Sequence, residues 1–155
     1  MAGLPEPEAG LVISYSYLWK EEEDRGLVEG RKDRPCAIVL AVDHPDPEAG
    51  GHKQVAVAPI THSPPHDMNV AVEIPPRVKQ HLGLDSERSW VILDEVNVFT
   101  WPGFDLRPVR RSADRIDYGL LPPKLFAQLI QKFSRLREEG RVVTSSRDEP
   151  ASSAR

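Results

Sequence analysis

Short apolar runs alternate with polar segments rich in glycine and proline along most of this chain. Apolar and aromatic residues predominate at positions 10–19, and further segments rich in apolar residues follow at 35–42, 54–60, 69–74, 89–93 and 96–101. Short runs of this kind, rich in β-branched and aromatic residues, are typical of strands. The pattern therefore predicts five or six short strands over the first two thirds of the sequence.

Helical patterns occur at two places. Pro75 opens a segment that predicts one or two helical turns up to Leu82, with Gly83 as the stop. A stronger pattern covers 122–136, where apolar residues recur at spacings of three and four: Leu125, Phe126, Leu129, Ile130, Phe133 and Leu136. Gly140 is expected to end this helix, whose apolar stripe predicts packing against the core.

The remaining segments carry no clear periodicity. Lys20–Asp33 is predicted to be a long charged loop, and 104–118 to be irregular and basic. Residues 1–9 are expected to form a flexible N-terminus, and 139–155 a disordered tail rich in Ser, Arg and Ala. Between them, 10–138 is predicted to be one mostly β (α+β) domain, a small antiparallel barrel with a C-terminal amphipathic helix.

Composition narrows the class of protein. The net charge of −4 argues against non-specific binding of long nucleic acids, which depends on many phosphate contacts. Two basic clusters, 31–34 and 107–111, either bind a few nucleotides or are solvated loops. The single cysteine, Cys36, excludes an internal disulfide framework and lies in an apolar run, where a buried, inert thiol is expected.

No apolar run approaches the roughly 20 residues of a membrane helix. No signal-like apolar stretch follows the acidic start either, so the sequence predicts a cytoplasmic protein without a membrane partner.

Five ordered segments resemble the PemK/MazF toxin family over about residues 10–136. The first is the apolar run 10–13 with Trp19, and the second is Arg34-Pro35 before an apolar strand. The third is 57–63, a strand that ends in Pro-x-Thr at Thr61. The fourth is the acidic and polar strand 94–99, and the fifth is Gly119 before the last helix.

The resemblance implies an SH3-like barrel, usually dimeric, that acts as the toxin of a type II toxin–antitoxin system. Such toxins are metal-independent, sequence-selective endoribonucleases without a cofactor. They cleave single-stranded RNA by attack of the 2′-hydroxyl, leaving a 2′,3′-cyclic phosphate. A cognate antitoxin holds them silent, growth is inhibited when they are free, and the toxin–antitoxin complex binds DNA. Asp33 before the arginine and the insertion 102–116 depart from the family pattern, so RNA preference and partner identity do not transfer.

Cleavage of RNA without a metal needs a group that stabilises charge on the phosphorane. Arg34 is the first candidate, because a guanidinium matches two phosphate oxygens and stays charged. The alternative is a surface arginine paired with Asp33 or Glu29. Thr61 is the second candidate, since its hydroxyl can contact a phosphate oxygen or orient the 2′-hydroxyl. Its alternative role is a hydrogen bond within a turn.

His62 is the third catalytic candidate, as a general acid or base, because its ordinary pKa lies near neutrality. The alternative is a surface loop histidine. His66 and Asp67 lie close by in sequence, but Pro64-Pro65 prevents the helix that stacks two histidines on one face. No metal site is therefore predicted.

Lys32, Ser63, Asn97 and Trp101 are the candidate substrate-binding residues. Exposed aromatic rings stack unpaired bases, and an amide can hydrogen-bond a base edge. The alternative is that Phe99 and one of its neighbours fill the core, and Phe99 is expected to be inside.

Two other functions stay open at this point. One is a non-catalytic protein of the same fold that poisons a DNA topoisomerase by binding it, with its function in the C-terminal residues. The Ser/Arg-rich tail has no aromatic anchor, which counts against this function. The other is an inactive interaction module. If the protein is a toxin, either the ribonuclease or the topoisomerase poison, an antitoxin segment lying over Lys20–Asp33 would block Arg34.

Overall fold

The computed structural model describes residues 4–27, 30, 32–109 and 114–148. These residues form the strands β1 Leu11–Tyr15, β2 Arg34–Asp43, β3 Lys53–Thr61, β4 Ala71–Glu73, β5 Trp90–Ile92, β6 Glu95–Thr100, β7 Asp117–Leu120 and β8 Val143–Ser146. The helices are α1 Lys20–Asp24, α2 Pro76–Leu82 and α3 Pro123–Glu138, with short 3-10 turns η1 Pro47–Ala49 and η2 Met68–Val70.

Most strands belong to one antiparallel path in the order β4-β5-β3-β2-β1-β7. Strand β6 pairs with β3 beside this path and continues into a parallel pairing with β8. The prediction of a mostly β, α+β protein is confirmed. Among the described residues, the outer strands β4 and β7 do not pair with each other, so this path is open at both ends.

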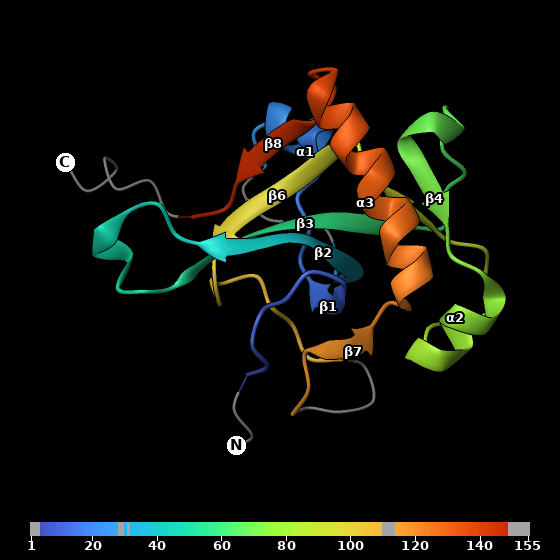
Figure 1. Cartoon of the computed structure of the whole chain (residues 1–155), viewed down its shortest axis with the longest axis horizontal. Coiled ribbons are helices and arrows are strands. Elements are labelled where there is room, and N and C mark those ends of the chain that lie inside the picture. Colours follow the sequence, from blue (N-terminus) through green and yellow to red (C-terminus); the bar gives the residue numbers. More distant parts are fainter. Residues whose placement is uncertain (1–3, 28–29, 31, 110–113, 149–155) are drawn as a thin grey trace.

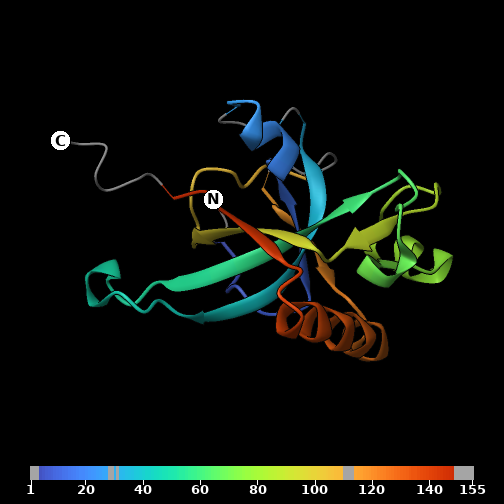
Figure 2. The same ribbon diagram turned by 90° about the horizontal axis from the view of Figure 1, so that it is seen from above.

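Two apolar clusters stabilise the sheet. Helix α3 covers one of them with Leu125, Leu129, Phe133 and Leu136, the stripe that the sequence predicted. The second cluster contains stacked aromatic rings, with Tyr15 and Phe99 5.0 Å apart between ring centroids. Figures 1 and 2 show α3 against one side of the sheet and α1 on the opposite side.

The β2–β3 hairpin places the candidate residues at one end of the sheet. Its strands pair in the register Cys36 with Pro59 and Ala37 with Ala58, and its turn carries η1. Figure 2 shows this turn projecting far from the rest of the molecule. Arg34 begins β2 and Thr61 ends β3, so both lie at the opposite end of the hairpin.

Four segments differ from the sequence prediction. Strand β7 begins at Asp117, within the segment 104–118 that was predicted to be irregular, because it pairs with β1. Strand β1 ends at Tyr15 rather than near Trp19, because the chain turns there into α1. The charged segment Lys20–Asp33 therefore begins with a helix, and at its start the backbone N–H of Trp19 donates to Oε1 of Glu22 at 3.0 Å. Strand β8 lies within 139–155, where disorder was expected, because its backbone finds partners along the free edge of β6.

Residues 149–155, 1–3 and Glu29 lie outside the described residues, and so do Arg31, Arg110 and Arg111 of the basic clusters. In the part of the chain that is described, every helix is too short or too polar to span a bilayer.

Candidate functional site

A groove of about 1640 Å³ lies at the end of the β2–β3 hairpin where β2 begins and β3 ends. The ends of these two strands supply one side, and residues from α2, from the segment after α2 and from β7 supply others. Five of the seven predicted site residues line it: Lys32, Arg34, Thr61, His62 and Ser63. The structure therefore brings together residues that are almost 30 positions apart in the sequence.

Arg34 is half-buried at the groove wall. Its guanidinium carbon lies 5.1 Å from the centre of the Trp19 ring, which is within the range of a cation–π contact. Asp33, one of the two carboxylates considered as its partner, forms an ion pair with Arg107 at 3.7 Å instead. Arg34 forms no ion pair with another described residue, and its buried Nε has no hydrogen-bond acceptor among them. Within the described residues its charge therefore has a stacking partner and no carboxylate partner, and Glu29, the other carboxylate considered, lies outside them.

Thr61 makes a hydrogen bond within a turn, which the sequence suggested as its alternative role. Its Oγ1 accepts from the backbone N–H of Ser63 at 3.1 Å. This contact fixes the turn after β3, but it uses a lone pair and leaves the hydroxyl hydrogen free to donate. Thr61 can thus serve both the turn and a ligand oxygen in the groove.

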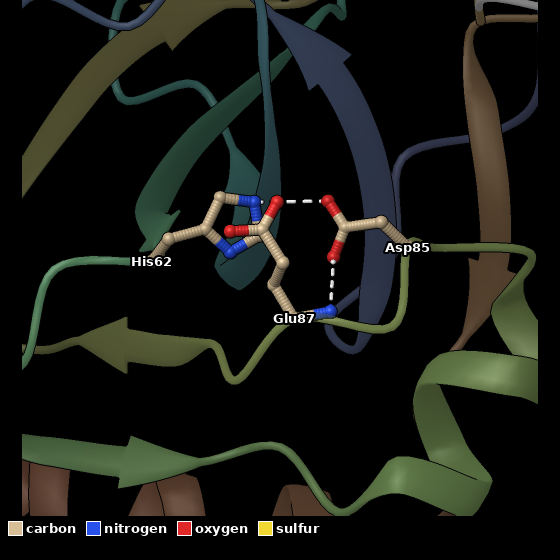
Figure 3. A group of neighbouring side chains, drawn as sticks. All are labelled: His62, Asp85 and Glu87. Carbon is tan, nitrogen blue, oxygen red and sulfur yellow. Dashed lines mark hydrogen bonds and ion pairs between the residues drawn. The ribbon is translucent and has the colours of Figure 1, made fainter.

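Both ring nitrogens of His62 face protein groups. Nε2 lies 2.9 Å from Oδ2 of Asp85, which is in the segment after α2 (Figure 3). Nδ1 lies 3.0 Å from Oγ of Ser89 and 3.1 Å from the carbonyl oxygen of Arg88. His62 is exposed to the groove, so its ring is fixed in orientation but reachable from solvent.

His62, Asp85 and Glu87 are close enough to be considered as metal ligands, since their ligand atoms lie within 4.8 Å of one another. Both oxygens of Asp85 are already engaged, however. Oδ1 accepts from the Lys79 ammonium at 2.6 Å and Oδ2 meets the His62 ring. A metal ion would have to displace both contacts and would lie near a buried ammonium. The arrangement suits a hydrogen-bonded network better than a cation site.

Two acidic residues at the groove have perturbed acidity. Burial raises the pKa of Asp94 and the pKa of Glu95 above their ordinary values. Glu95 Oε1 accepts from the Tyr17 hydroxyl and from the backbone N–H of Lys20, each at 3.0 Å. These bonds tie the start of α1 to β6 and fix the side of the groove that carries Trp19.

Charges of both signs line the groove, but most of its carboxylates have basic partners. Asp67 pairs with Arg141 at 3.3 Å, and Asp117 pairs with Arg115 at 3.4 Å. With Asp33 also paired, Arg34 and Lys32 are the groove cations that form no ion pair within the described residues. Among the described groove residues, Asp94 and Glu95 are carboxylates that form no ion pair, so free groups of both signs line the groove.

Asn97 and Trp101 lie outside the groove, in the interior of the molecule. Asn97 is fully buried, where its Oδ1 accepts from Leu18 N–H at 3.0 Å and its Nδ2 donates to the Leu18 carbonyl at 2.8 Å. Trp101 packs with Phe99 in the second apolar cluster, and Phe99 is inside as expected. In this conformation Asn97 and Trp101 serve packing and backbone hydrogen bonding.

Cys36 is also in the interior, as the sequence predicted, and burial raises the pKa of its thiol. A thiol that stays protonated and has no access to solvent is unreactive, so Cys36 belongs to the core rather than to the site.

Three residues at the site carried no recognised signal in the sequence. Trp19 appeared only as the end of a strand and as part of the first segment of the family resemblance, with no role at the site, although an aromatic residue beside a charged segment is a reasonable stacking candidate. Asp85 and Ser89 follow a short helix and belong to no motif. Only the pairing of β5 with both β3 and β4 brings their segment to His62.

These features define a mostly β protein with a mixed-charge groove at one end of its sheet, centred on Arg34, Thr61 and His62. Comparison with protein-family models and with curated protein sequences finds no match to this chain.

Proposed function

We propose that this protein is a metal-independent endoribonuclease of the PemK/MazF type, the toxin of a type II toxin–antitoxin system. One observation carries the proposal: Arg34, Thr61 and His62, chosen from the sequence for this chemistry, line one groove. The guanidinium of Arg34 adds support, because it forms no ion pair with the residues that the structure describes and a site for phosphate needs a cation that no carboxylate neutralises. In this proposal, the strands of the open sheet path curl into an SH3-like barrel.

In the proposed reaction the 2′-oxygen of one nucleotide forms a bond to the adjacent phosphorus, and the bond from phosphorus to the 5′-oxygen breaks. The 2′-hydroxyl gives its proton to solvent, and the departing 5′-oxygen receives one from His62. Arg34 stabilises the negative charge on the phosphorane, and Thr61 donates a hydrogen bond to a phosphate oxygen. The products are a 2′,3′-cyclic phosphate and a 5′-hydroxyl, and the substrate itself supplies the nucleophile.

The test is cleavage of a long single-stranded RNA by purified protein in excess EDTA. Wild type should give discrete fragments with cyclic-phosphate ends. Arg34→Ala should cleave roughly a hundred- to a thousandfold more slowly, the typical loss on removing a group that stabilises developing charge. Arg135→Ala is the matched control, because Arg135 is an exposed arginine on α3, away from the groove.

Absence of cleavage by folded, antitoxin-free wild type across several RNAs would reject the proposal. It would favour a protein that binds a target such as a DNA topoisomerase, or an inactive interaction module. Equal loss of activity in Arg34→Ala and Arg135→Ala would reject the role of Arg34 specifically.

A cognate antitoxin and a second copy of the chain are the proposed partners, in the cytoplasm. The segment 20–33 flanks Arg34, and its residues Glu21 and Lys32 line the groove. An antitoxin segment lying over it would cover Arg34. A complex with antitoxin that still cleaves RNA at the wild-type rate would contradict this arrangement.

A further inference from the structure

Arg107 is the arginine of the basic cluster 107–111 that the structure describes, and the proposed function assigns it no role. Its Nε lies 3.7 Å from Oδ1 of Asp33, with the two side chains 33% and 53% exposed. Asp33 lines the groove directly before Arg34, whereas Arg107 is not among the described residues that line it. Arg107 therefore reaches the Asp33 carboxylate from outside the groove.

The guanidinium of Arg107 is held by the turn that carries it. Its Nη1 donates to the backbone carbonyl oxygens of Phe104 at 2.8 Å and of Leu106 at 3.0 Å. Its backbone N–H donates to the carbonyl oxygen of Ser14 on β1 at 2.9 Å. These bonds fix both the backbone and one side of the guanidinium, and they leave Nε to face Asp33.

The end of β1 lies between the segment that carries Arg107 and the start of β2. Tyr15 pairs with Arg34 on one side and forms a bridge to Leu106 on the other. The neighbouring Asp105 forms a two-bond ion pair with Arg147, with both distances 3.2 Å and the two side chains only 9% and 10% exposed. The segment is therefore fastened to the sheet beside the row of residues that contains Arg34.

A free carboxylate at Asp33 would compete with any anion for Arg34. Asp33 precedes Arg34 in the chain and lies outside β2, so the alternation of faces along a strand does not keep the two side chains apart. In the structure the carboxylate is with Arg107. Arg34 stacks on Trp19 instead, and its buried Nε has no acceptor among the described residues. Because opposite charges attract strongly at short distances, the partner of Asp33 decides whether Arg34 can bind phosphate.

We propose that Arg107 is a positioning residue, which holds the Asp33 carboxylate and so keeps the Arg34 guanidinium free for a phosphate group. The use of that phosphate in RNA cleavage rests on the proposed function, whereas the contact between Arg107 and Asp33 does not. Asp33 and the insertion 102–116 are the two departures from the PemK/MazF pattern, and this contact joins them. The acidic residue before the arginine is accompanied by a second arginine that holds it.

Binding of a probe that has phosphates but no nucleophile tests the proposal. The probe is a short, fluorescently labelled 2′-O-methyl RNA of mixed sequence, which attack of a 2′-hydroxyl cannot cleave. Arg107→Ala should bind it about two- to sixfold more weakly. The loss is modest because a partly exposed ion pair of Asp33 with Arg34 is weak and leaves Arg34 free for part of the time.

The same substitution is then made in two further backgrounds. In Asp33→Asn no carboxylate is released, so Arg107→Ala should weaken binding less than it does in wild type. In Asp94→Asn, which removes a different carboxylate of the groove, the loss should be as large as in wild type. Equal losses in all three backgrounds would reflect only the missing positive charge and would overturn the proposal. Failure of wild type to bind the probe would overturn the assignment of Arg34 as a phosphate ligand.

The Nε–Hε NMR signal of Arg34 provides a second measurement, which needs no ligand. Arg34→Lys removes this signal and so assigns it. In Arg107→Ala the signal should move as Asp33 becomes the partner of Arg34. In the double variant Arg107→Ala/Asp33→Asn it should return to its wild-type position. A signal that stays in place in folded Arg107→Ala would contradict the proposal.

Asp33→Asn alone decides the matter if Arg107→Ala does not fold. It leaves every contact of Arg107 with its own turn intact and removes only the carboxylate. The Nε–Hε signal of Arg107 should then move more than that of Arg34, because Arg107 has lost its partner. The opposite order would show that Asp33 belongs to Arg34 and would overturn the proposal.

Activity separates the failure of this proposal from the failure of the proposed function. If the protein cleaves RNA, kcat/KM should fall in Arg107→Ala by the same factor as the affinity for the probe, and adding Asp33→Asn should restore part of it. A wild type that binds the probe and cleaves no RNA would reject the ribonuclease and leave the role of Arg107 to the probe and the NMR signals. Cleavage without coupling between Arg107 and Asp33 would reject the role of Arg107 and leave the ribonuclease in place.

Discussion

Replacing Asn97 by alanine removes the two hydrogen bonds that join β6 to the backbone of Leu18. Asn97 is fully buried and Leu18 is 1% exposed, so water cannot replace the lost partners. A buried donor or acceptor left unpaired costs about 1–3 kcal/mol. Two such groups predict a loss of about 2–6 kcal/mol in the free energy of unfolding. Because whole domains are stable by only about 5–15 kcal/mol, this is a large fraction.

Urea unfolding followed by circular dichroism measures this loss, with an unchanged slope against urea as the sign of two-state behaviour. In a chain of this size each kcal/mol lowers the melting temperature by about 2–4 °C, so a decrease of roughly 4–24 °C is expected. Asn69→Ala is the matched control, since Asn69 is exposed and its side chain hydrogen-bonds the Asp67 carboxylate rather than a buried backbone group.

A loss below about 1 kcal/mol in Asn97→Ala would refute the argument from unpaired buried groups. A variant with wild-type stability and lost RNA affinity would return Asn97 to the substrate-binding residues that the sequence suggested.

Three further predictions concern the core, the acidic side of the groove and the turn after β3. Leu129→Ala should cost about 2–5 kcal/mol in urea unfolding, because Leu129 is fully buried, whereas exposed Gln131→Ala should cost little. Burial raises the pKa of Glu95 above its ordinary 4.5, so its contribution to stability is present below pH 4.5 and is lost as pH rises through the folded value. Glu95→Gln should therefore gain stability relative to wild type as pH is raised from 4 to 7 in a series of thermal unfolding curves, and a constant difference would contradict this. Thr61→Val should lower kcat for RNA while Thr61→Ser retains activity, and equal rates for both variants would exclude a role for the hydroxyl.

Most strands and the main helix could be predicted from the sequence because local patterns of apolar and polar residues encode them. The apolar stripe of α3 identifies both the helix and the face it buries, since a helix places residues three and four apart on one side. The runs at 35–42 and 54–60 correspond to β2 and β3 because each is short, apolar and bounded by turn residues. Arg34 and Thr61 were recognised as candidates because each lies at the end of such a run and in a segment that carries the family resemblance.

Elements that depend on partners distant in the sequence could not be predicted from local patterns in the same way. Strand β8 has little apolar character, and it exists because the edge of β6 offers hydrogen bonds to its backbone. Helix α1 is short, and its capping by Glu22 and its ties to Glu95 give it a stability that its length does not predict.

The sequence by itself determined that this chain is a mostly β protein with an amphipathic helix, and it predicted candidate site residues at the start of β2 and the end of β3. Only the tertiary structure decided which candidates meet. It brought Lys79, Asp85 and Ser89 to His62, and it placed Asn97 and Trp101 in the interior. The physical reason is that periodicity along a chain reports burial within one element. Contact between side chains depends on the register and twist of strands that pair over long distances in sequence.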